Sequence, residues 1–224
     1  MTPITHPWNL SSQEAIELQQ KLRSKVKIKA MSKPLQYIAG ADISFNRGED
    51  TVYVGMVVLK YPEMIEVERA VLIDEANFPY IPGLLSFRET PLLLKAWEKL
   101  SIKPDLIVTD GHGLAHMRRF GVACHLGLLT DTAAIGCAKK ILVGKHDVLG
   151  EEKGSVAYIE DKDEIVGAVL RTRKNVKPVY ISAGHKINLE EAIEVMKTCA
   201  VNYRIPEPTR QAHLIVNELR RENM

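Results

Sequence analysis

The chain has few cysteines, and their spacing excludes two common kinds of small-protein architecture. Only three occur among 224 residues, Cys124, Cys137 and Cys199, and none forms a CxxC pair. Disulfide frameworks and structural zinc sites need paired or clustered cysteines, so neither is expected. The three thiols are expected to be reduced and mostly buried, as free cysteines usually are.

Long apolar runs are also missing. No stretch approaches the roughly 18 apolar residues of a membrane span, so contact with a membrane is not expected. The N-terminal stretch MTPITHPWNLSSQEA lacks a positively charged region followed by an apolar one, so no signal peptide is expected. Together with the reduced thiols, these features predict a cytoplasmic protein.

A strong net charge is lacking as well. The chain has 30 Lys and Arg residues against 28 Asp and Glu residues, which gives a net charge of +2. The protein is therefore no polycation, and any binding of nucleic acid has to come from local clusters of basic side chains. We find no internal repeat, low-complexity tract or linker, and the length suits a single domain over residues 1–224.

The order of apolar and alternating runs predicts a mixed sheet flanked by helices. Three strands at 36–45, 51–60 and 65–73 are joined by turn-like segments, which indicates an antiparallel meander. A helix, a short strand, a second helix and another strand follow at 87–100, 106–110, 119–129 and 134–138. Further elements are expected as helices at 11–28, 189–200 and 206–221, a hairpin of 155–158 with 165–171, and a strand at 179–183. This α/β order matches the ribonuclease H-like arrangement, with a mixed five-stranded sheet.

Three acidic residues occupy unusual places in this pattern. Asp42 interrupts the apolar strand YIAGADISF, where an unpaired carboxylate is costly and needs a partner. Asp110 ends the strand LIVT, directly before the glycine-rich run GHG, and Glu89 opens a helix. Each has an ordinary alternative role, as a paired strand residue, a helix cap or a partner of the helix dipole. In the expected sheet, however, the first and fourth strands are neighbours, so Asp42 and Asp110 should lie side by side with Glu89 in reach.

Carboxylates at such short range repel each other unless a cation lies between them. Oxygen ligands without cysteine favour Mg²⁺ or Mn²⁺ over zinc, so Asp42 and Asp110 are the candidate metal ligands. Such a site can activate water and stabilise the leaving oxygen of a phosphodiester. Cationic side chains are expected at the same edge of the sheet, namely His116, Arg118, Arg119, Lys139 and Lys140. Lys139 could instead be a solvent-facing cap, and His112 and His185 could be loop histidines bonded to the backbone.

Four segments, taken in this order, resemble the endonuclease V family. They are PYIPGLLSFRE at 79–89, DGHGLAH at 110–116, IGCAKK at 135–140 and RIPEPTR at 204–210, within a resemblance that runs from about residue 36 to 210. The resemblance implies a ribonuclease H-like fold and a Mg²⁺-dependent endodeoxyribonuclease of DNA repair, with Mn²⁺ as a substitute metal. It further implies a substrate that contains deoxyinosine, and hydrolysis of the second phosphodiester bond on the 3′ side of the deaminated base, leaving a 5′-phosphate.

The same resemblance assigns roles to individual residues. The implied catalytic residues are Asp42, Glu89, Asp110, His116 and Lys139. Tyr80 resembles the family's wedge, an aromatic ring that fills the gap left in the stack when a base rotates out. The other implied DNA-binding residues are Pro79, Ile81, Pro82, Gly83, Gly111 and Gly113. The family usually has Pro after the DGHGxxH histidine, whereas this chain has Met117, which removes one backbone constraint. His213 receives no assignment.

Hypoxanthine has a carbonyl where adenine has an amino group, and it carries a proton on N1. A selective pocket should therefore donate to O6 and accept from N1–H, which backbone groups in glycine-rich loops at Gly83, Gly111 to Gly113 and Gly136 can do. We expect a monomer that acts on deoxyinosine-containing DNA, with single strands and RNA as further substrates. Two alternatives are a nuclease of this fold directed mainly at inosine in RNA or at other lesions and branched DNA, and a non-catalytic nucleic-acid-binding module.

Overall fold

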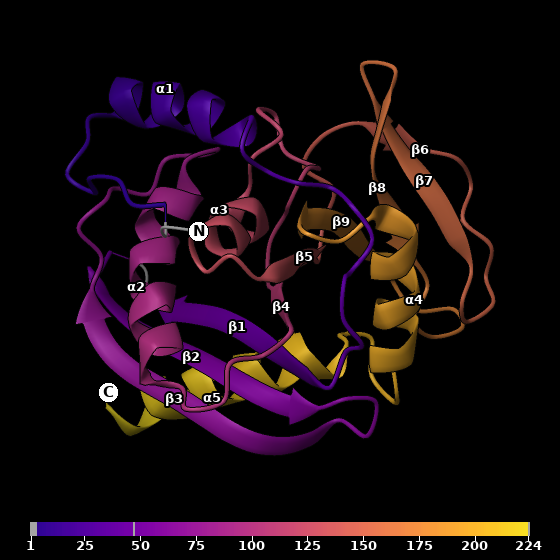
Figure 1. Ribbon diagram of the computed structural model, residues 1–224. Helices are drawn as coiled ribbons and strands as arrows, with labels where there is room; N and C mark the ends of the chain where they lie inside the picture. The colour runs from indigo at the N-terminus through magenta and orange to yellow at the C-terminus, as the bar shows by residue number, and fades with distance from the viewer. Residues whose placement is uncertain (1–3, 47, 224) are drawn as a thin grey trace.

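The computed structural model of the protein describes residues 4–46 and 48–223, which form a continuous mixed sheet covered by helices (Figure 1). The strands lie in the order β3-β2-β1-β4-β5-β9-β8-β7-β6. They are β1 Tyr37–Phe45, β2 Thr51–Lys60, β3 Ile65–Glu75, β4 Leu106–Thr109, β5 Ala133–Ala138, β6 Lys145–His146, β7 Val156–Asp161, β8 Glu164–Leu170 and β9 Val179–His185. The helices are α1 Ser12–Arg23, α2 Leu85–Lys99, α3 Val122–Leu129, α4 Leu189–Cys199 and α5 Glu207–Glu222.

The first five strands have the predicted arrangement. Strands β1, β2 and β3 form an antiparallel meander, while β4 is parallel to β1 and β5 is parallel to β4. The predicted hairpin and the strand after it are present as β7, β8 and β9. The predicted number of five strands is too low, because β9 pairs antiparallel with β5 and extends the sheet through β8 and β7 to the short β6.

Helices cover both faces of the sheet, and each face has its own core. Helices α4 and α5 pack on the face that carries Ile38, and α2 and α3 pack on the face that carries Ala39 and Ala41. Because successive residues of a strand point to opposite faces, Asp42 belongs to the face covered by α5. Among the described residues, no helix combines the length and the apolar character that crossing a membrane demands.

Helix α5 packs unusually close to β1. A Cβ atom on Gly40 would lie 1.8 Å from the carbonyl oxygen of Pro208, so only glycine fits at this point of the strand. On β2, a Cβ on Gly55 would lie 2.7 Å from the Cγ1 atom of Val216. The two glycines therefore let α5 lie directly on the sheet, next to the strand that bears Asp42.

Helix α3 begins three residues later than predicted, at Val122. Arg119 has a φ of 55°, in the left-handed region, and Gly121 is extended with φ −90° and ψ −172°. Neither conformation continues a helix, so the segment 110–121 remains a loop.

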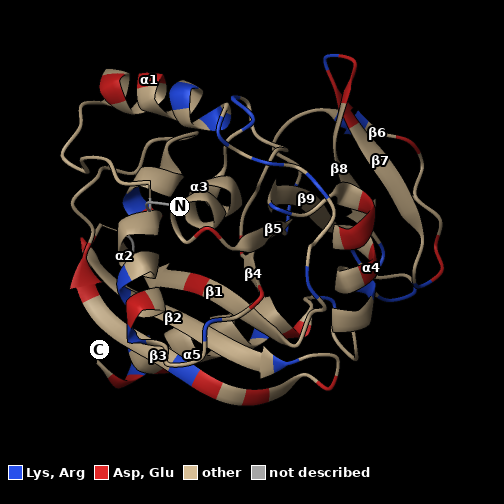
Figure 2. Ribbon diagram, viewed as in Figure 1, with Lys and Arg blue, Asp and Glu red and all other residues tan. Residues whose placement is uncertain are grey.

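Helix α1 starts as predicted, with Ser11 and Glu14 forming a capping box, but it ends at Arg23 rather than near residue 28. Val26 and Ile28, just beyond its end, are β-branched and favour helix less. Lys and Arg residues gather at this end of α1 and along the segment that follows it (Figure 2).

Candidate active site

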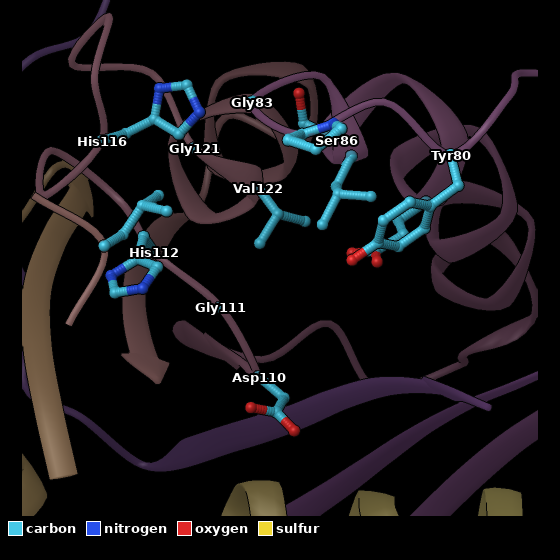
Figure 3. Close-up of a pocket in the computed structure, with 13 residues that line it drawn as sticks. Tyr80, Gly83, Ser86, Asp110, Gly111, His112, His116, Gly121 and Val122 are labelled. Atoms are coloured by element: carbon cyan, nitrogen blue, oxygen red, sulfur yellow. The ribbon is translucent and has the colours of Figure 1, made fainter. Parts of the chain in front are cut away.

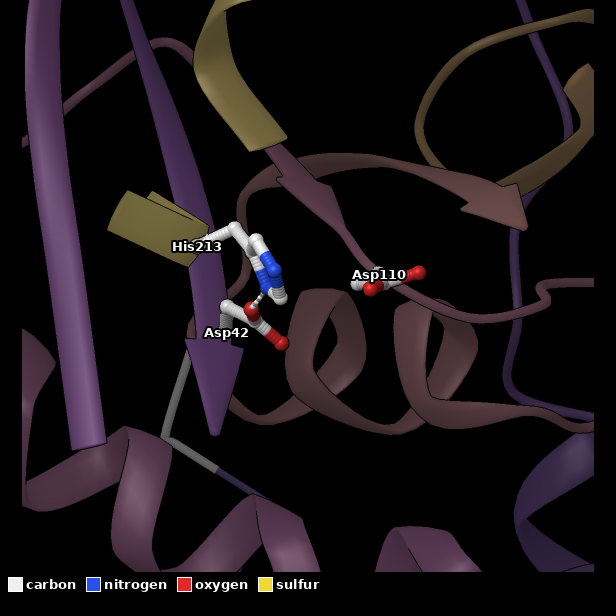
Figure 4. Close-up of side chains that lie close together, drawn as sticks. All are labelled: Asp42, Asp110 and His213. Atoms are coloured by element: carbon white, nitrogen blue, oxygen red, sulfur yellow. Dashed lines mark hydrogen bonds and ion pairs between the residues drawn. The ribbon is translucent and has the colours of Figure 1, made fainter. Parts of the chain in front are cut away.

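Asp42, within β1, and Asp110, directly after the end of β4, lie side by side. The parallel register places Ala41 opposite Thr109, one residue before each carboxylate. Ligand atoms of Asp42, Asp110 and His213 all lie within 4.8 Å of one another (Figure 4). Burial and the neighbouring charge of Asp42 raise the pKa of Asp110, even though Lys139 pairs with the same carboxylate. The predicted neighbourhood of the first and fourth strands, and of their carboxylates, is confirmed.

His213 reaches this pair from α5 and was not singled out by the sequence. Its Nδ1 atom lies 2.8 Å from Oδ2 of Asp42. A carboxylate accepts, so Nδ1 carries the hydrogen and donates it to Asp42. The signal that could have located His213 is indirect: the RIPEPTR segment starts a helix, and Gly40 lets that helix lie on β1.

Glu89 approaches the pair from the second turn of α2. Burial, followed by the charges of Asp42 and Asp110, raises the pKa of Glu89 to about 8. An acidic group whose ionised form is opposed by two other carboxylates is a favourable place for a cation, which would reverse the repulsion. Asp42, Asp110 and the imidazole of His213 therefore fit a hard divalent ion, with Glu89 nearby.

A cavity of about 220 Å³ opens beside the carboxylates, between the segment 80–89 and the loop 110–121 (Figure 3). Its lining residues are Tyr80, Pro82, Gly83, Leu85, Ser86, Glu89, Asp110, Gly111, His112, His116, Gly121, Val122 and Leu142. Ser86 Oγ and His112 Nδ1 are buried and have no hydrogen-bond partner among the described residues. Unpartnered polar atoms in a mostly apolar cavity are available to a bound polar molecule.

Residues 19–214 match the family model described as Endonuclease V. The chain belongs to the endonuclease V family. An Endonuclease V from Myxococcus xanthus is 46% identical to it over 222 residues, which cover 99% of this chain and 94% of the relative.

Solved structures of the endonuclease V family confirm the α/β, ribonuclease H-like class of the fold. The Endonuclease V of Streptomyces avermitilis superposes with a TM-score of 0.92 at 37% identity, over 98% of this chain and 97% of that one. The Endonuclease V of Ciona intestinalis, in complex with a 24mer DNA containing an inosine followed by a ribo-adenosine, gives a TM-score of 0.82 at 27% identity, over 95% and 98% of the chains.

The segment that resembles the endonuclease V wedge lies at the mouth of the cavity. Pro79, Tyr80 and Pro82 are exposed, and the Tyr80 side chain borders the opening with 60% of its surface accessible. Ile81 is half-buried and packs with the small core beneath α1 and α2. Gly83 has a φ of 82°, which favours glycine, and it lines the cavity wall.

Of the glycines in the DGHGLAH motif, only Gly111 lines the cavity. The N–H of Gly113 donates to Ser182 Oγ at 2.8 Å, and a Cβ on Gly113 would lie 2.2 Å from the carbonyl oxygen of Ala183. Gly136 lies under the same loop, where a Cβ would be 2.5 Å from the nitrogen of Gly113. Gly113 and Gly136 therefore allow β5, β9 and the loop to pack closely, and do not face the cavity.

The expected cluster of cations at the carboxylates is only partly formed. Lys139 does contact Asp110. Arg119 instead points to the β7–β8 turn, where it pairs with Asp161 and Glu164 at 2.8 Å each. Arg118 bonds to Gln19 and to the carbonyl of Gly83. Both arginines thus bond to partners other than Asp42 and Asp110, which their position in the sequence does not reveal.

His116 is buried in the cavity wall. Burial, followed by the charge of Arg118 and the neighbouring His112, lowers the pKa of His116 to about 4, and its Nδ1 accepts the Arg118 N–H at 3.2 Å. His185 accepts the N–H of Lys27 at 3.3 Å, as expected for a backbone-bonded histidine. The cysteines are free and buried, as predicted.

Proposed function

We propose that this protein is a Mg²⁺-dependent endonuclease that recognises deaminated adenine in DNA and hydrolyses the second phosphodiester bond on its 3′ side. The observation that carries the proposal is the convergence of Asp42, Asp110 and His213 beside a cavity with an exposed tyrosine at its mouth. A relative of this family from Ciona intestinalis has been solved with inosine-containing DNA, which supports the class of substrate.

Asp42 and Asp110 would hold the metal ion, with His213 at its side and Glu89 as the third acidic residue. Oxygen-rich ligand sets favour Mg²⁺, and Mn²⁺ can substitute. When bound, the ion lowers the pKa of water and stabilises charge on the phosphate. His213 orients the Asp42 carboxylate through its Nδ1–H, and Lys139 balances part of the charge of Asp110.

The cavity would take the extruded base. The imidazole of His112 is held neutral at neutral pH, because burial lowers its pKa to about 4. Its unpartnered Nδ1 can accept from N1–H of hypoxanthine, and the free hydroxyl of Ser86 can donate to O6. Adenine has a donor at position 6 and an acceptor at N1, so it would leave the buried groups of His112 and Ser86 unpaired. An unpaired buried polar group strongly disfavours binding, and adenine would therefore be rejected. Tyr80 would fill the vacated place in the stack.

The test is a cleavage assay on matched oligonucleotides that differ only in one base. Inosine, adenosine and guanosine are placed in single-stranded DNA, duplex DNA and RNA, and the cut is mapped on a sequencing gel. We expect Mg²⁺-dependent cleavage of inosine-containing DNA directly after the 3′ neighbour of inosine, at the second phosphodiester bond, and we expect EDTA to abolish it. Equal cutting of all three bases, or cutting in EDTA, would refute the proposal. The RNA arm matters because the DNA in the Ciona complex carries a ribonucleotide after the inosine.

A further inference from the structure

One polar side chain of α1 is entirely buried. Gln19 has no accessible surface, and its amide contacts two segments far away in the chain. Its Nε2 donates to the carbonyl oxygen of Phe120 at 2.7 Å and to that of Gly83 at 3.2 Å, and its Oε1 accepts from Nε of Arg118. The orientation of the amide follows from chemistry, because the reverse orientation would set its oxygen against two carbonyls and its NH₂ against a guanidinium. Burial of an amide is costly unless its hydrogen bonds are made, and here they are.

Arg118 completes the same network. Its Nη2 donates to the carbonyl of Gly83 at 2.6 Å, so this single carbonyl receives a hydrogen bond from Gln19 and another from Arg118. Among the residues the structure describes, Arg118 forms no ion pair. Its guanidinium therefore makes a charge-assisted hydrogen bond to the Gly83 carbonyl. Gly83 permits the approach, since a Cβ there would lie 2.8 Å from Nη2 of Arg118 and 2.8 Å from Sδ of Met117.

The network joins the two walls of the cavity. Gly83 belongs to one wall and is the third residue after Tyr80, whereas Gly121, next to Phe120, belongs to the opposite wall. Neither Gln19 nor Arg118 lines the cavity. Gln19 bonds to one residue on each side, so the distance between the walls depends on a side chain behind them.

We propose that Gln19 and Arg118 are positioning residues that fix the width of the base cavity and the pose of the Tyr80 loop. The proposal rests on the proposed function, because it assigns the network to discrimination between bases. A narrow cavity excludes the extra 2-amino group of guanine, which is the only difference between guanine and hypoxanthine. A wider one would admit it and would hold hypoxanthine less firmly, while the metal ligands on β1 and β4 stay in place.

Gln19→Leu keeps the volume and removes all three hydrogen bonds, and Gln20→Leu, on the exposed side of the same helix, is the matched control. We expect the kcat/KM ratio of inosine to guanosine to fall about tenfold to a hundredfold, the range for a sub-ångström loss of positioning. Most of this change should come from a higher KM for inosine, with the single-turnover rate at saturation within about threefold of wild type. Hydrogen exchange of the amides at 80–84 should accelerate in Gln19→Leu and not in Gln20→Leu.

Arg118→Lys and Arg118→Met provide a second test at a partly exposed position, which guards against a misfolded Gln19 variant. Lysine keeps a donor for the Gly83 carbonyl and should retain most of the discrimination, whereas methionine should lose it. Unchanged base discrimination in both Gln19→Leu and Arg118→Met would overturn the proposal, as would a uniform loss on every substrate without faster exchange at 80–84. If the wild type shows no preference for inosine, the proposed function fails, and the exchange measurement alone then decides whether the network holds the loop.

Discussion

Two charge clusters lie at opposite ends of the loop 110–121, and they are built on opposite principles. At its start, Asp110 faces Asp42 and Glu89, and burial followed by neighbouring carboxylates raises the pKa of Asp110 and the pKa of Glu89. At its end, Arg119 is satisfied by two carboxylates and by the carbonyls of His116 and Asp161. The second cluster is complete in itself, whereas the first is not. Arg119 thus forms a structural ion-pair cluster, whereas the carboxylates at the start of the loop form a site that could hold a cation.

The largest effect is expected from substitutions of Asp42 and Asp110, in the cluster at the start of the loop. Asp42→Asn and Asp110→Asn should each lower the cleavage rate about 10³-fold or more, since several kcal/mol of metal-dependent stabilisation is lost and each 1.4 kcal/mol is tenfold. Binding of inosine-containing DNA should largely remain, and the melting temperature without metal should be unchanged or higher, because repulsion is removed. Addition of Mg²⁺ should raise the melting temperature of the wild type only. Either variant with near wild-type turnover would refute the metal assignment.

The pH dependence of stability should differ in sign between the two clusters. The folded pKa of Glu89 is raised from 4.5 to about 8, so the folded state holds the proton more tightly than the unfolded state. Metal-free stability should therefore fall as pH rises from about 4.5 to 8, by at most about 1.4 kcal/mol per pH unit from this group. Glu89→Gln or saturating Mg²⁺ should flatten that slope in urea titrations. If the slope persists in Glu89→Gln, another group causes it.

The complete cluster should respond to mutation mainly in stability. Arg119→Met leaves the largely buried Asp161 without its partner and should cost about 1 to 3 kcal/mol, the penalty for one unpaired buried polar group. The pair with Glu164, which is 56% exposed, should add little. The pKa of Glu164 is lowered by Arg119, so this contribution is present above pH 4.5 and is lost as pH falls below it. Denaturant unfolding of wild type and variant at pH 7 and pH 4 measures both effects. Cleavage per folded molecule should drop by less than about tenfold, and a loss as large as that of Asp110→Asn would place Arg119 in the active site.

The smallest effect concerns Tyr80, at the mouth of the cavity. Tyr80→Ala should weaken binding to inosine-containing duplex by about 1 to 3 kcal/mol, the size of one lost stacking interaction. Binding to the same sequence as a single strand should change less, because no gap in a stack has to be filled. Fluorescence anisotropy with both substrates makes the comparison, and equal losses would exclude the wedge role.

The sequence was sufficient where local pattern decides the structure. Asp42 and Asp110 could be paired because an antiparallel meander followed by a helix and a strand sets β1 beside β4, and each carboxylate stands near a strand end. Met117, which stands where the family usually has proline, packs its sulfur against Gly83.

Contacts between distant segments could not be predicted in the same way. The place of His213 depends on how α5 sits on β1, which is decided by the contact of Gly40 with Pro208. The direction of Arg119 is set by its ion pairs with Asp161 and Glu164, more than 40 residues later, and the width of the sheet depends on the pairing of β9 with β5. None of these contacts can be predicted from the periodic pattern of apolar residues, because that pattern reports only local structure.

The close contact between Gly40 and Pro208 also affects the order in which the site is assembled during synthesis. Strand β1 carries Asp42 early in the chain, but the histidine that orients it arrives only with α5, more than 170 residues later, 2.8 Å from the carboxylate once docked. During synthesis on the ribosome, a growing chain holds both aspartates well before it holds His213. The cluster of Asp42, Asp110 and His213 is therefore completed last, when the final helix packs on the sheet.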